Sequence, residues 1–400
     1  MKSALPVSET GLGFNFLTLS LCPSLFQNRS PNVSRAENMV WRIDRFLYRK
    51  KSAGLRAILF PLALASHPYG WAVRLRAIAY DLGAFTPKRL PCPVISVGNI
   101  TIGGTGKTPL AMFLARHLVE QGIPVSVLTR GYKGTKAAGA AVTDGRTVLL
   151  SPEEAGDEPY LMANLLKDVP ILVGKDRWAS GQKALRDHGV RGMILDDGYQ
   201  HLQLHRDLNI LLIDAEIGFG DGFLLPRGIL REPISSLRRA DLVLLTKVKD
   251  SEACSALESE LRRRHPTLPI FHSRYEILGL VGPKKEWEFI DSVRGKRVVA
   301  ISGIGNPHYF LSLLRREGAD VVNEISFPDH HAYTARDVMA VEGMAKEVDW
   351  VITTEKDLVK LRRLKIDALP LRALRIEPKI WEEKEFLKRV MALFAAPRKA

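Results

Sequence analysis

The stretch that decides the fold is PVISVGNITIGGTGKT, residues 93–108. Its first part, residues 94–97, is short, apolar and rich in β-branched residues, which predicts a buried strand of a parallel sheet. Its second part, residues 101–108, follows the phosphate-binding pattern G-x-x-x-x-G-K-[ST], except that Thr101 takes the first glycine position. Glycines let backbone N–H groups approach phosphate oxygens, and a following helix N-terminus adds favourable dipole charge. The stretch therefore predicts a site for a nucleoside triphosphate.

The positions of this loop have separate expected roles. We expect Lys107 to reach the β- and γ-phosphates and the Thr108 hydroxyl to take a position on Mg²⁺. Apolar residues at helical spacing follow the loop, which argues against a simple glycine turn between a strand and a helix. The residues expected to bind the nucleotide are Thr101, Ile102, Gly103, Gly104, Thr105, Gly106, Lys107 and Thr108.

Beyond the loop, strand patterns alternate with helix patterns as far as residue 245, which predicts a parallel sheet with helices on both faces. From Phe271 to Val281 the sequence looks extended, which indicates a linker and possibly a β-ribbon. A second, smaller α/β unit begins near Arg297 and ends in an amphipathic helix, about Trp381–Phe394. The predicted division is an extension at 1–38, a basic amphipathic segment at 39–90, a P-loop domain at 91–270, a linker at 271–290 and a second α/β domain with a closing helix at 291–400.

The basic charge of the chain is unevenly distributed. The net charge is +14, and the range 41–90 holds ten Lys and Arg against Asp44 and Asp81. These cations surround an apolar run that Pro61 and Pro68 interrupt, and the run is shorter than the ~20 apolar residues that span a bilayer. The pattern predicts a helical segment lying in the interface of an anionic membrane rather than a nucleic-acid site. The alternative is a pair of packed N-terminal helices with solvated arginines.

The N-terminus and the cysteines indicate the compartment. Residues 1–38 have no clear cleavage site for a secretory signal, so we interpret them as a disordered extension or a misplaced start ahead of Met39. The three cysteines form no C-x-x-C pair. Their spacing argues against a disulfide framework or a zinc site and fits a reducing cytoplasm.

Carboxylates follow the predicted strands where a nucleotide-binding sheet places magnesium ligands. Asp196 and Asp197 come directly after the apolar strand at 192–195, although a solvated loop is the alternative. Asp157, in a Gly-Asp-Glu-Pro turn, is a candidate base for a substrate hydroxyl. His330 follows Asp329, a pairing that suits the orientation of a proton acceptor better than metal binding.

Two further motifs resemble known signatures only in part. Thr246-Lys247-Val248-Lys249 is similar to the guanine-reading N-K-x-D but lacks its Asn and Asp, so specificity for GTP is not supported. Residues 302–307, SGIGNP, match half of a dinucleotide-binding fingerprint, and a tight turn between a strand and a helix explains them better.

Taken together, the motifs resemble the tetraacyldisaccharide 4'-kinase family, the lipid A 4'-kinases of Gram-negative bacteria. The resemblance covers nearly the whole chain from about Met39, and Thr101 in place of glycine is itself typical of the family. The motifs that carry it are VGNITIGGTGKTP at 97–109, TRGY at 129–132, GDEP at 156–159, DDGYQH at 196–201, LREP at 230–233, SGIGNP at 302–307, FPDHH at 327–331 and TEKD at 354–357.

The resemblance implies a P-loop kinase at the cytoplasmic face of the bacterial inner membrane. It would move the γ-phosphate of ATP to the 4'-hydroxyl of tetraacyldisaccharide 1-phosphate and form lipid IVA. Lys107 would hold the phosphates, and Asp157 would act as the base with help from His330 across a closing cleft. The implied cofactors are ATP and Mg²⁺, and the implied magnesium ligands are Thr108, Asp196, Asp197 and Glu232. The implied partners are the lipid substrate and the membrane surface, without nucleic acid or an obligate protein partner.

Two other classes of protein remain as alternatives. A regulatory P-loop ATPase or GTPase would use the loop as a switch and would need no acceptor site. It would have no use for Asp157 and His330 as a pair. A basic membrane-peripheral binding module would use residues 41–90 without chemistry, and it leaves the phosphate loop unexplained.

Overall fold

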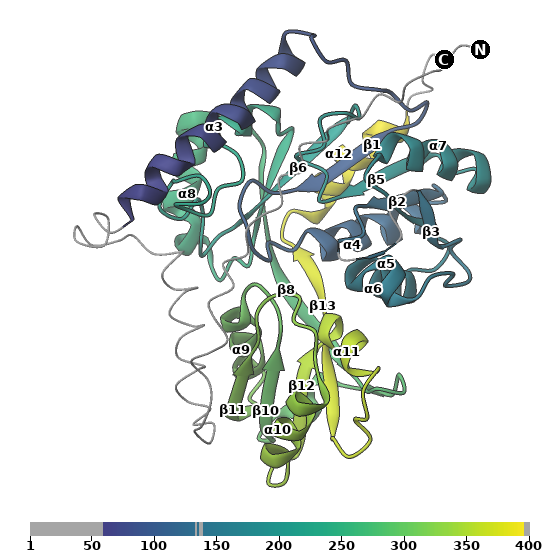
Figure 1. The fold of residues 1–400 in the computed structure, drawn as a ribbon, viewed down its shortest axis with the longest axis vertical. Helices are drawn as coiled ribbons and strands as arrows, with labels where there is room; N and C mark the ends of the chain where they lie inside the picture. The colour runs from purple at the N-terminus through teal and green to yellow at the C-terminus, as the bar shows by residue number, and fades with distance from the viewer. Residues whose placement is uncertain (1–58, 133, 136–138, 396–400) are drawn as a thin grey trace, which may run out of the picture.

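The computed structural model describes residues 59–132, 134–135 and 139–395, and Figure 1 shows two lobes joined by a pair of long strands. The predicted extension at 1–38 and the first part of the predicted basic segment lie outside the described residues. All but one of the described strands form one continuous path of hydrogen-bonded neighbours that crosses from one lobe to the other. This arrangement confirms the predicted class, a P-loop-type parallel sheet joined to a second, smaller α/β unit.

The larger lobe, which we call the P-loop lobe, is built on the strand order β7-β6-β1-β5-β2-β4-β3. The strands are parallel except for β3, which lies antiparallel to β4 at the edge. Its elements are β1 (Val94–Gly98), α4 (Lys107–Glu120), β2 (Val125–Thr129), β3 (Ala140–Thr143), α5 (Pro152–Ala155), α6 (Asp157–Leu165), β4 (Ile171–Val173), α7 (Arg177–His188), β5 (Gly192–Asp196), β6 (Leu208–Asp214), the 3-10 helix η2 (Ile234–Arg239), β7 (Leu242–Thr246) and α8 (Ser251–Arg264).

Strand β1 lies in the middle of this lobe and is covered on both faces. Ile95 and Val97 pack into the cluster that contains Leu110 of α4, whereas Val94 packs on the opposite face with Ala184 of α7. Side chains of a strand alternate between the two faces, so a strand covered by helices on both sides has apolar residues at almost every position. Full burial of each large aliphatic side chain contributes about 1.5–3 kcal/mol. The apolar sequence of 94–97 is thereby explained.

Two long strands connect the lobes. The first residues of β8 (Ile270–Val281) pair in parallel with β7, and from Ser273 onward β8 pairs antiparallel with β13 (Leu371–Ile380). The stretch that we interpreted as a linker, and possibly a β-ribbon, is therefore one strand of a two-stranded antiparallel ribbon. Its partner β13 was not predicted, because it lies almost a hundred residues further along the chain.

The second lobe is a parallel sheet in the order β11-β10-β12, continued by β13 and β8. Val298 and Ala300 of β10 pack on the α9 face, whereas Val299 and Ile301 pack on the face that α10 and α11 cover. The elements are β9 (Trp287–Glu288), the 3-10 helix η3 (Ile290–Val293), β10 (Arg297–Ser302), α9 (Pro307–Arg316), β11 (Asp320–Ser326), α10 (Ala335–Ala345), β12 (Trp350–Thr354) and α11 (Glu355–Leu361).

The closing helix α12 (Glu383–Ala395) returns to the P-loop lobe (Figure 1). Its buried residues Phe386, Leu387 and Val390 belong to the same core cluster as Ile95 of β1. We expected this helix to close the second α/β domain, and the packing corrects that expectation. The reason is that β13 carries the chain back along the ribbon before α12 begins, so its apolar face meets the P-loop lobe.

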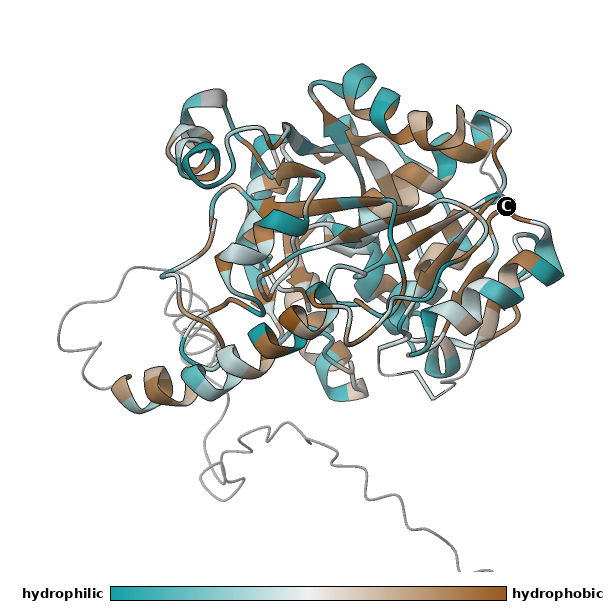
Figure 2. Cartoon of the chain, turned by 90° about the horizontal axis from the view of Figure 1, so that it is seen from above, coloured by the Kyte–Doolittle hydropathy of each residue, from teal (hydrophilic) through white to brown (hydrophobic). Residues whose placement is uncertain are grey.

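Helix α3 (Phe60–Asp81) lies along the outside of the P-loop lobe (Figures 1 and 2). It is one helix, and the two prolines that interrupt its apolar run lie at its first turn (Pro61) and inside it (Pro68). Proline suits the first turn of a helix because no intrahelical partner for its missing N–H exists there. The apolar side chains that α3 exposes to solvent are Phe60, Leu62, Leu64, Trp71, Leu75 and Ile78. Among the helices the structure describes, none has the length and apolarity to cross a bilayer.

Candidate active site

The phosphate-binding loop runs from β1 to the first residue of α4. Gly103 and Gly106 have φ values of 106° and 91°, in the left-handed region that favours glycine. The Asn99 side-chain amide donates to the Thr105 hydroxyl at 2.9 Å and ties the two ends of the loop together. The loop therefore has the backbone that the sequence pattern predicts.

Thr101 departs from the usual motif for a reason visible in the backbone. It is buried and forms an antiparallel bridge with Leu230, and the flanking bonds join Ile102 N to Ile229 O at 2.8 Å and Arg231 N to Ile100 O at 2.7 Å. The φ angle of Thr101 is not positive, so an extended β-branched residue suits this position. The loop begins as a short strand pair, and glycine is not required there.

The carboxyl ends of β1 and β5 bring Thr108 and Asp196 together. Val97 pairs with Asp196 across these two strands, so the loop that leaves β1 runs beside the aspartate. The Thr108 hydroxyl donates to Asp196 Oδ2 at 3.1 Å. Asp196 is 2% exposed, and its Oδ1 has no hydrogen-bond partner among the described residues. A buried carboxylate oxygen without a partner, beside a threonine hydroxyl, fits a hard cation such as Mg²⁺.

The two adjacent aspartates lie in different electrostatic surroundings. Burial, with the nearby Glu158 and Asp197 carboxylates, raises the pKa of Asp196 to about 7. Burial alone would also raise the pKa of Asp197, but the Lys107 and Arg231 cations hold it below its ordinary value. Lys107 Nζ lies 3.7 Å from Asp197 Oδ1, and Arg231 donates to both carboxylate oxygens at 3.1 and 3.3 Å. Asp196 therefore faces the threonine, whereas Asp197 faces the cations.

Glu232 is buried close to the start of the loop, where its carboxylate is already paired with a cationic side chain. Its carboxylate forms an ion pair with Arg239 of η2, and both side chains are largely buried. The segment that carries it is held to the loop by the Arg231 N–Ile100 O bond. Glu232 can act as a magnesium ligand only if it shares its carboxylate with Arg239 or releases it.

A charged cluster links the two lobes beside this site. Lys356 Nζ of α11 lies 2.9 Å from Glu158 Oε1 of α6, 3.1 Å from Asp329 Oδ1 and 3.3 Å from His330 Nε2. Burial alone would lower the pKa of Lys356, but Glu158 and Asp329 raise it above its ordinary value. His330 has a φ of 59° and its ring centroid lies 5.2 Å from that of Tyr132. The cluster positions the second lobe against α6.

Asp157 is the first residue of α6, directly before Glu158. His330 Nε2 lies 4.0 Å from Glu158 Oε1, so the histidine of the second lobe reaches the helix turn on which Asp157 sits. Sequence reasoning singled out Asp157 and the Asp329–His330 pair but assigned no role to Glu158 or Lys356, and it included Arg231 only within the LREP motif. The available signal was position, because Lys356 comes two residues after the end of strand β12, where the parallel sheet places site residues.

The second lobe and strand β8 each approach the backbone of the phosphate loop closely. A Cβ atom added at Gly305 would lie 3.0 Å from the backbone N of Gly104, and one added at Gly106 would lie 2.0 Å from the Tyr275 hydroxyl of β8. Asn306 caps helix α9 by accepting from Tyr309 N at 3.0 Å. The SGIGNP motif is thus a tight turn between a strand and a helix, as predicted, and its second glycine permits contact with the phosphate loop.

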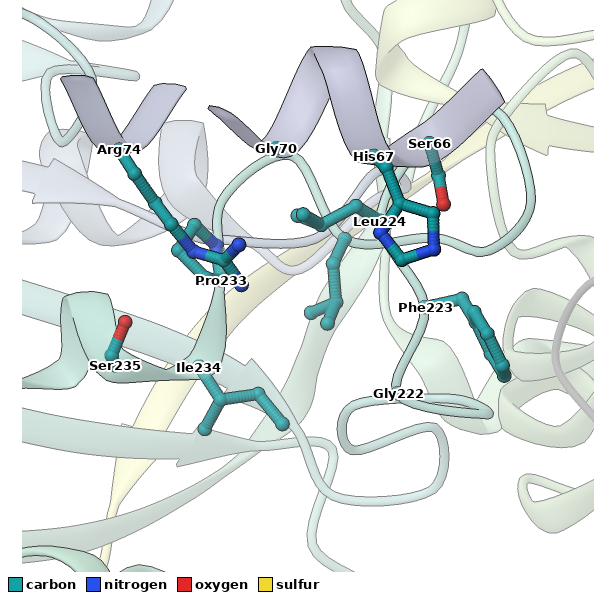
Figure 3. Close-up of a pocket in the computed structure, with 11 residues that line it drawn as sticks. Ser66, His67, Gly70, Arg74, Gly222, Phe223, Leu224, Pro233, Ile234 and Ser235 are labelled. Atoms are coloured by element: carbon teal, nitrogen blue, oxygen red, sulfur yellow. The ribbon is translucent and has the colours of Figure 1, made fainter. Parts of the chain in front are cut away.

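A pocket of about 310 Å³ lies beneath α3 and not at the phosphate loop (Figure 3). Ser66, His67, Gly70 and Arg74 of α3 line one side, and the segments 222–224 and 233–235 line the other. Leu230 also lines it, and the same residue bridges to Thr101 of the loop. The pocket and the phosphate site therefore share one segment of chain.

A phosphate loop, a threonine hydroxyl on a buried aspartate and a second lobe that delivers charged residues define a P-loop phosphotransferase. The family model described as "tetraacyldisaccharide-1-P 4'-kinase" matches residues 55–395. The chain therefore belongs to the tetraacyldisaccharide-1-P 4'-kinase family. The family resemblance drawn from the sequence is confirmed, and so is the prediction of an ATP-dependent kinase.

Relatives and a solved structure agree with this assignment. The tetraacyldisaccharide 4'-kinase of Geobacter sulfurreducens is 43% identical over 327 residues, which cover 81% of this chain and 90% of the relative. The enzyme of the same name from Desulfatibacillum aliphaticivorans is 41% identical over 334 residues, with 81% and 90% covered. The crystal structure of LpxK from Aquifex aeolicus in complex with ATP is 34% identical, has a TM-score of 0.67, and is matched over 85% of this chain and 99% of that chain.

Proposed function

We propose that this kinase transfers the γ-phosphate of ATP to the 4'-hydroxyl of a tetraacyldisaccharide 1-phosphate and so forms lipid IVA in lipid A synthesis. The observation that carries the proposal is that the nucleotide-side groups and the charged groups of the second lobe meet at one edge of the sheet. The Thr108–Asp196 pair lies behind the phosphate loop, and the Lys356 cluster brings His330 of the second lobe to α6. The names of the family and of its relatives supply the substrate.

On the nucleotide side, we assign the phosphates to Lys107 and to the backbone N–H groups of Thr101 to Thr108. Thr108 and Asp196 would hold Mg²⁺, with Asp197 near it and Glu232 contributing once it shares its carboxylate with Arg239. The unpartnered Oδ1 of Asp196 supports this assignment. When bound, Mg²⁺ neutralises charge on the phosphates as the bond to the leaving oxygen breaks. Lys107 and Arg231 place additional positive charge beside Asp197.

On the acceptor side, we assign the base to Asp157. Its carboxylate would take the proton of the 4'-hydroxyl while that oxygen forms its bond to the γ-phosphorus and the bond to the β–γ bridging oxygen breaks, releasing ADP. His330 would orient Asp157 or pass on its proton, and Lys356 would hold the histidine in place. The 4.0 Å approach of His330 to Glu158, the neighbour of Asp157, supports this arrangement.

We also propose that the enzyme works on the cytoplasmic face of the inner membrane, with α3 lying in the membrane interface. The exposed apolar side chains of α3 support this position, because an extended apolar patch on the surface is typical of a protein-binding or membrane-binding site. Arg74 and Arg76 on the same helix can meet anionic head groups. The pocket beneath α3 in Figure 3 lies between this helix and the segment that pairs with the phosphate loop through Leu230 and Thr101, which suits a lipid substrate.

The test is transfer of labelled γ-phosphate to a purified tetraacyldisaccharide 1-phosphate presented in mixed micelles with Mg²⁺. We expect a labelled lipid product from the wild-type chain and strongly reduced product from Asp157→Asn and Lys107→Met. Asp367→Asn, which makes the same chemical change at an exposed loop position, should keep full activity. ATP hydrolysis without a lipid product would overturn the proposal in favour of a regulatory ATPase. Full activity in Asp157→Asn would keep the kinase but remove the base.

A further inference from the structure

Cys254, Glu258 and His272 bring three different metal-binding atoms together away from the phosphate loop. Cys254 and Glu258 lie one turn apart on α8, and His272 lies on β8. The ligand atoms of the three lie within 4.8 Å of one another. His272 Nε2 is 2.8 Å from Glu258 Oε1, and Cys254 Sγ is 3.4 Å from the same oxygen. We propose that these side chains bind a divalent transition-metal ion of the Zn²⁺ class.

The chemistry of the three groups selects the kind of ion. A thiolate, a carboxylate and a neutral imidazole are each ligands that Zn²⁺ accepts, and a thiolate disfavours Mg²⁺ and Ca²⁺. The two anionic ligands balance the charge of a divalent ion. The spacings of 2.8 and 3.4 Å are close to those of ligand atoms that share one small ion at bond lengths of ~2.0–2.3 Å.

Binding has a defined proton balance. Burial, with the neighbouring Glu258 carboxylate, raises the pKa of the Cys254 thiol to about 11, so the thiol carries its proton at neutral pH when no metal is bound. On binding, the S–H bond breaks, the sulfur bonds to the ion, and the proton passes to solvent; the proton between His272 Nε2 and Glu258 leaves in the same way, so that Nε2 can bind the ion. Burial alone would raise the pKa of Glu258, but His272 and the Cys254 thiol hold it below its ordinary value. Glu258 is therefore already ionised.

Groups around His272 hold its ring in the orientation that a metal ligand needs. Its Nδ1 lies 2.8 Å from Glu382 Oε1, and its backbone N–H donates to the other oxygen of that carboxylate at 3.1 Å. The Trp381 ring stacks on the imidazole with centroids 5.4 Å apart. A carboxylate on Nδ1 fixes the tautomer in which Nε2 is the ligand, as in many carboxylate–histidine–metal sites.

The position of the site indicates what the ion would do. His272 is the last residue of β8 that pairs with β7, and the next residue begins the ribbon to the second lobe. An ion held by α8 and His272 would fasten the base of the ribbon to the P-loop lobe. The spacing of the cysteines led us to expect no zinc site. Spacing could not indicate this one, because it contains a single cysteine and combines side chains of a helix and a strand.

The proposal can be tested on the full chain with Co²⁺, whose bond to a thiolate gives a charge-transfer absorption that Mg²⁺ does not displace. We expect a band that saturates at one Co²⁺ per chain, is lost in Cys254→Ser, and is removed by added Zn²⁺. Cys92→Ser and Cys22→Ser are the matched controls and should keep the band. Glu382→Gln should weaken Co²⁺ binding by about 10–100-fold, since it alters only the group that orients the ligand.

A wild-type chain without the band, or a band unchanged in Cys254→Ser, would overturn the proposal. If Cys254→Ser does not fold, Glu258→Gln and His272→Gln decide the matter by the same absorption. Zn²⁺ should also raise the thermal midpoint of the wild-type chain and leave that of His272→Gln unchanged, and equal shifts in both would count against the site.

Discussion

Lys356 offers the sharpest test of how the two lobes cooperate. Its ammonium lies 2.9 Å from Glu158 on the P-loop lobe and 3.1 Å from Asp329 on the second lobe. Replacement by Met keeps most of the side-chain volume and removes the charge. The Glu158 and Asp329 carboxylates then lie close together beside His330, and the cation that joined them is gone. We expect the second lobe to be held less firmly against α6 and phosphate transfer to slow.

The magnitude follows from the burial of the three side chains. The Lys356 side chain is 16% exposed, whereas those of Glu158 and Asp329 are 34% and 39% exposed. Breaking a fully buried ion pair costs about 3–5 kcal/mol and losing an exposed one about 0.2–1 kcal/mol. This partly exposed cluster lies between these limits, at about 1–2 kcal/mol, which corresponds to a loss of about 5–30-fold in kcat/KM.

The pH dependence provides a second readout. Burial alone would raise the pKa of Glu158, but Lys356 holds it below its ordinary value of 4.5. A carboxyl with a lowered pKa in the folded state adds stability that is present above its unfolded pKa and is lost as the pH falls through the folded one. The difference between wild type and Lys356→Met should therefore be complete at pH 7 and should shrink as the pH falls below the ordinary value of 4.5 and through the lowered pKa of Glu158.

The assay is kcat/KM for labelled phosphate transfer together with urea unfolding at pH 7 and pH 4. Lys365→Met, at an exposed position shortly after α11, removes the same charge and should leave both quantities unchanged. Lys356→Arg should restore part of the activity. Wild-type kcat/KM and unfolding free energy in Lys356→Met at pH 7 would refute the assignment of this cluster as the link between the lobes.

Three further predictions address the site and the core. The pKa of Asp196 in the folded state is about 7 in the absence of Mg²⁺, so the unfolding free energy should fall as the pH rises from 5 to 8. In thermal melts this fall should disappear when Mg²⁺ is added and in Asp196→Asn. A fall that persists in Asp196→Asn would contradict the prediction. Gly305→Ala, whose Cβ would lie 3.0 Å from Gly104 N, should lower kcat with little change in the melting temperature, and unchanged kcat would show that the loop yields freely. Phe386→Ala should cost about 3–5 kcal/mol in urea unfolding, because its ring is fully buried against the P-loop lobe; a cost below about 1 kcal/mol would argue against that packing.

The sequence pattern was sufficient to predict the elements that are stabilised by interactions between residues close together in the chain. Residues 94–108 predicted a buried strand, a glycine loop and a following helix, because alternation, left-handed glycines and helical spacing all act within a few residues. The same holds for Asn306 and Pro307, which mark the start of α9. The roles assigned to Asp157, Asp197, Glu232 and His330 remain predictions, since they concern a bound nucleotide and lipid.

Other features depended on pairs of residues that are far apart in the chain. β13 was missed and α12 was assigned to the wrong surroundings, because the ribbon that returns the chain is stabilised by strand pairing across almost a hundred residues. The Glu258–His272–Glu382 chain escaped notice for the same reason.

The sequence by itself determined that this protein has a phosphate loop on a parallel sheet and belongs with the 4'-kinases, because these properties reside in short, ordered motifs. Only the tertiary structure decided that Thr101 is an extended, strand-paired residue, that Asp196 faces Thr108 while Asp197 faces Lys107 and Arg231, and that Lys356 joins the lobes. Burial and charge at each of these groups are set by neighbours that the fold brings together, and no local pattern records which neighbours those are.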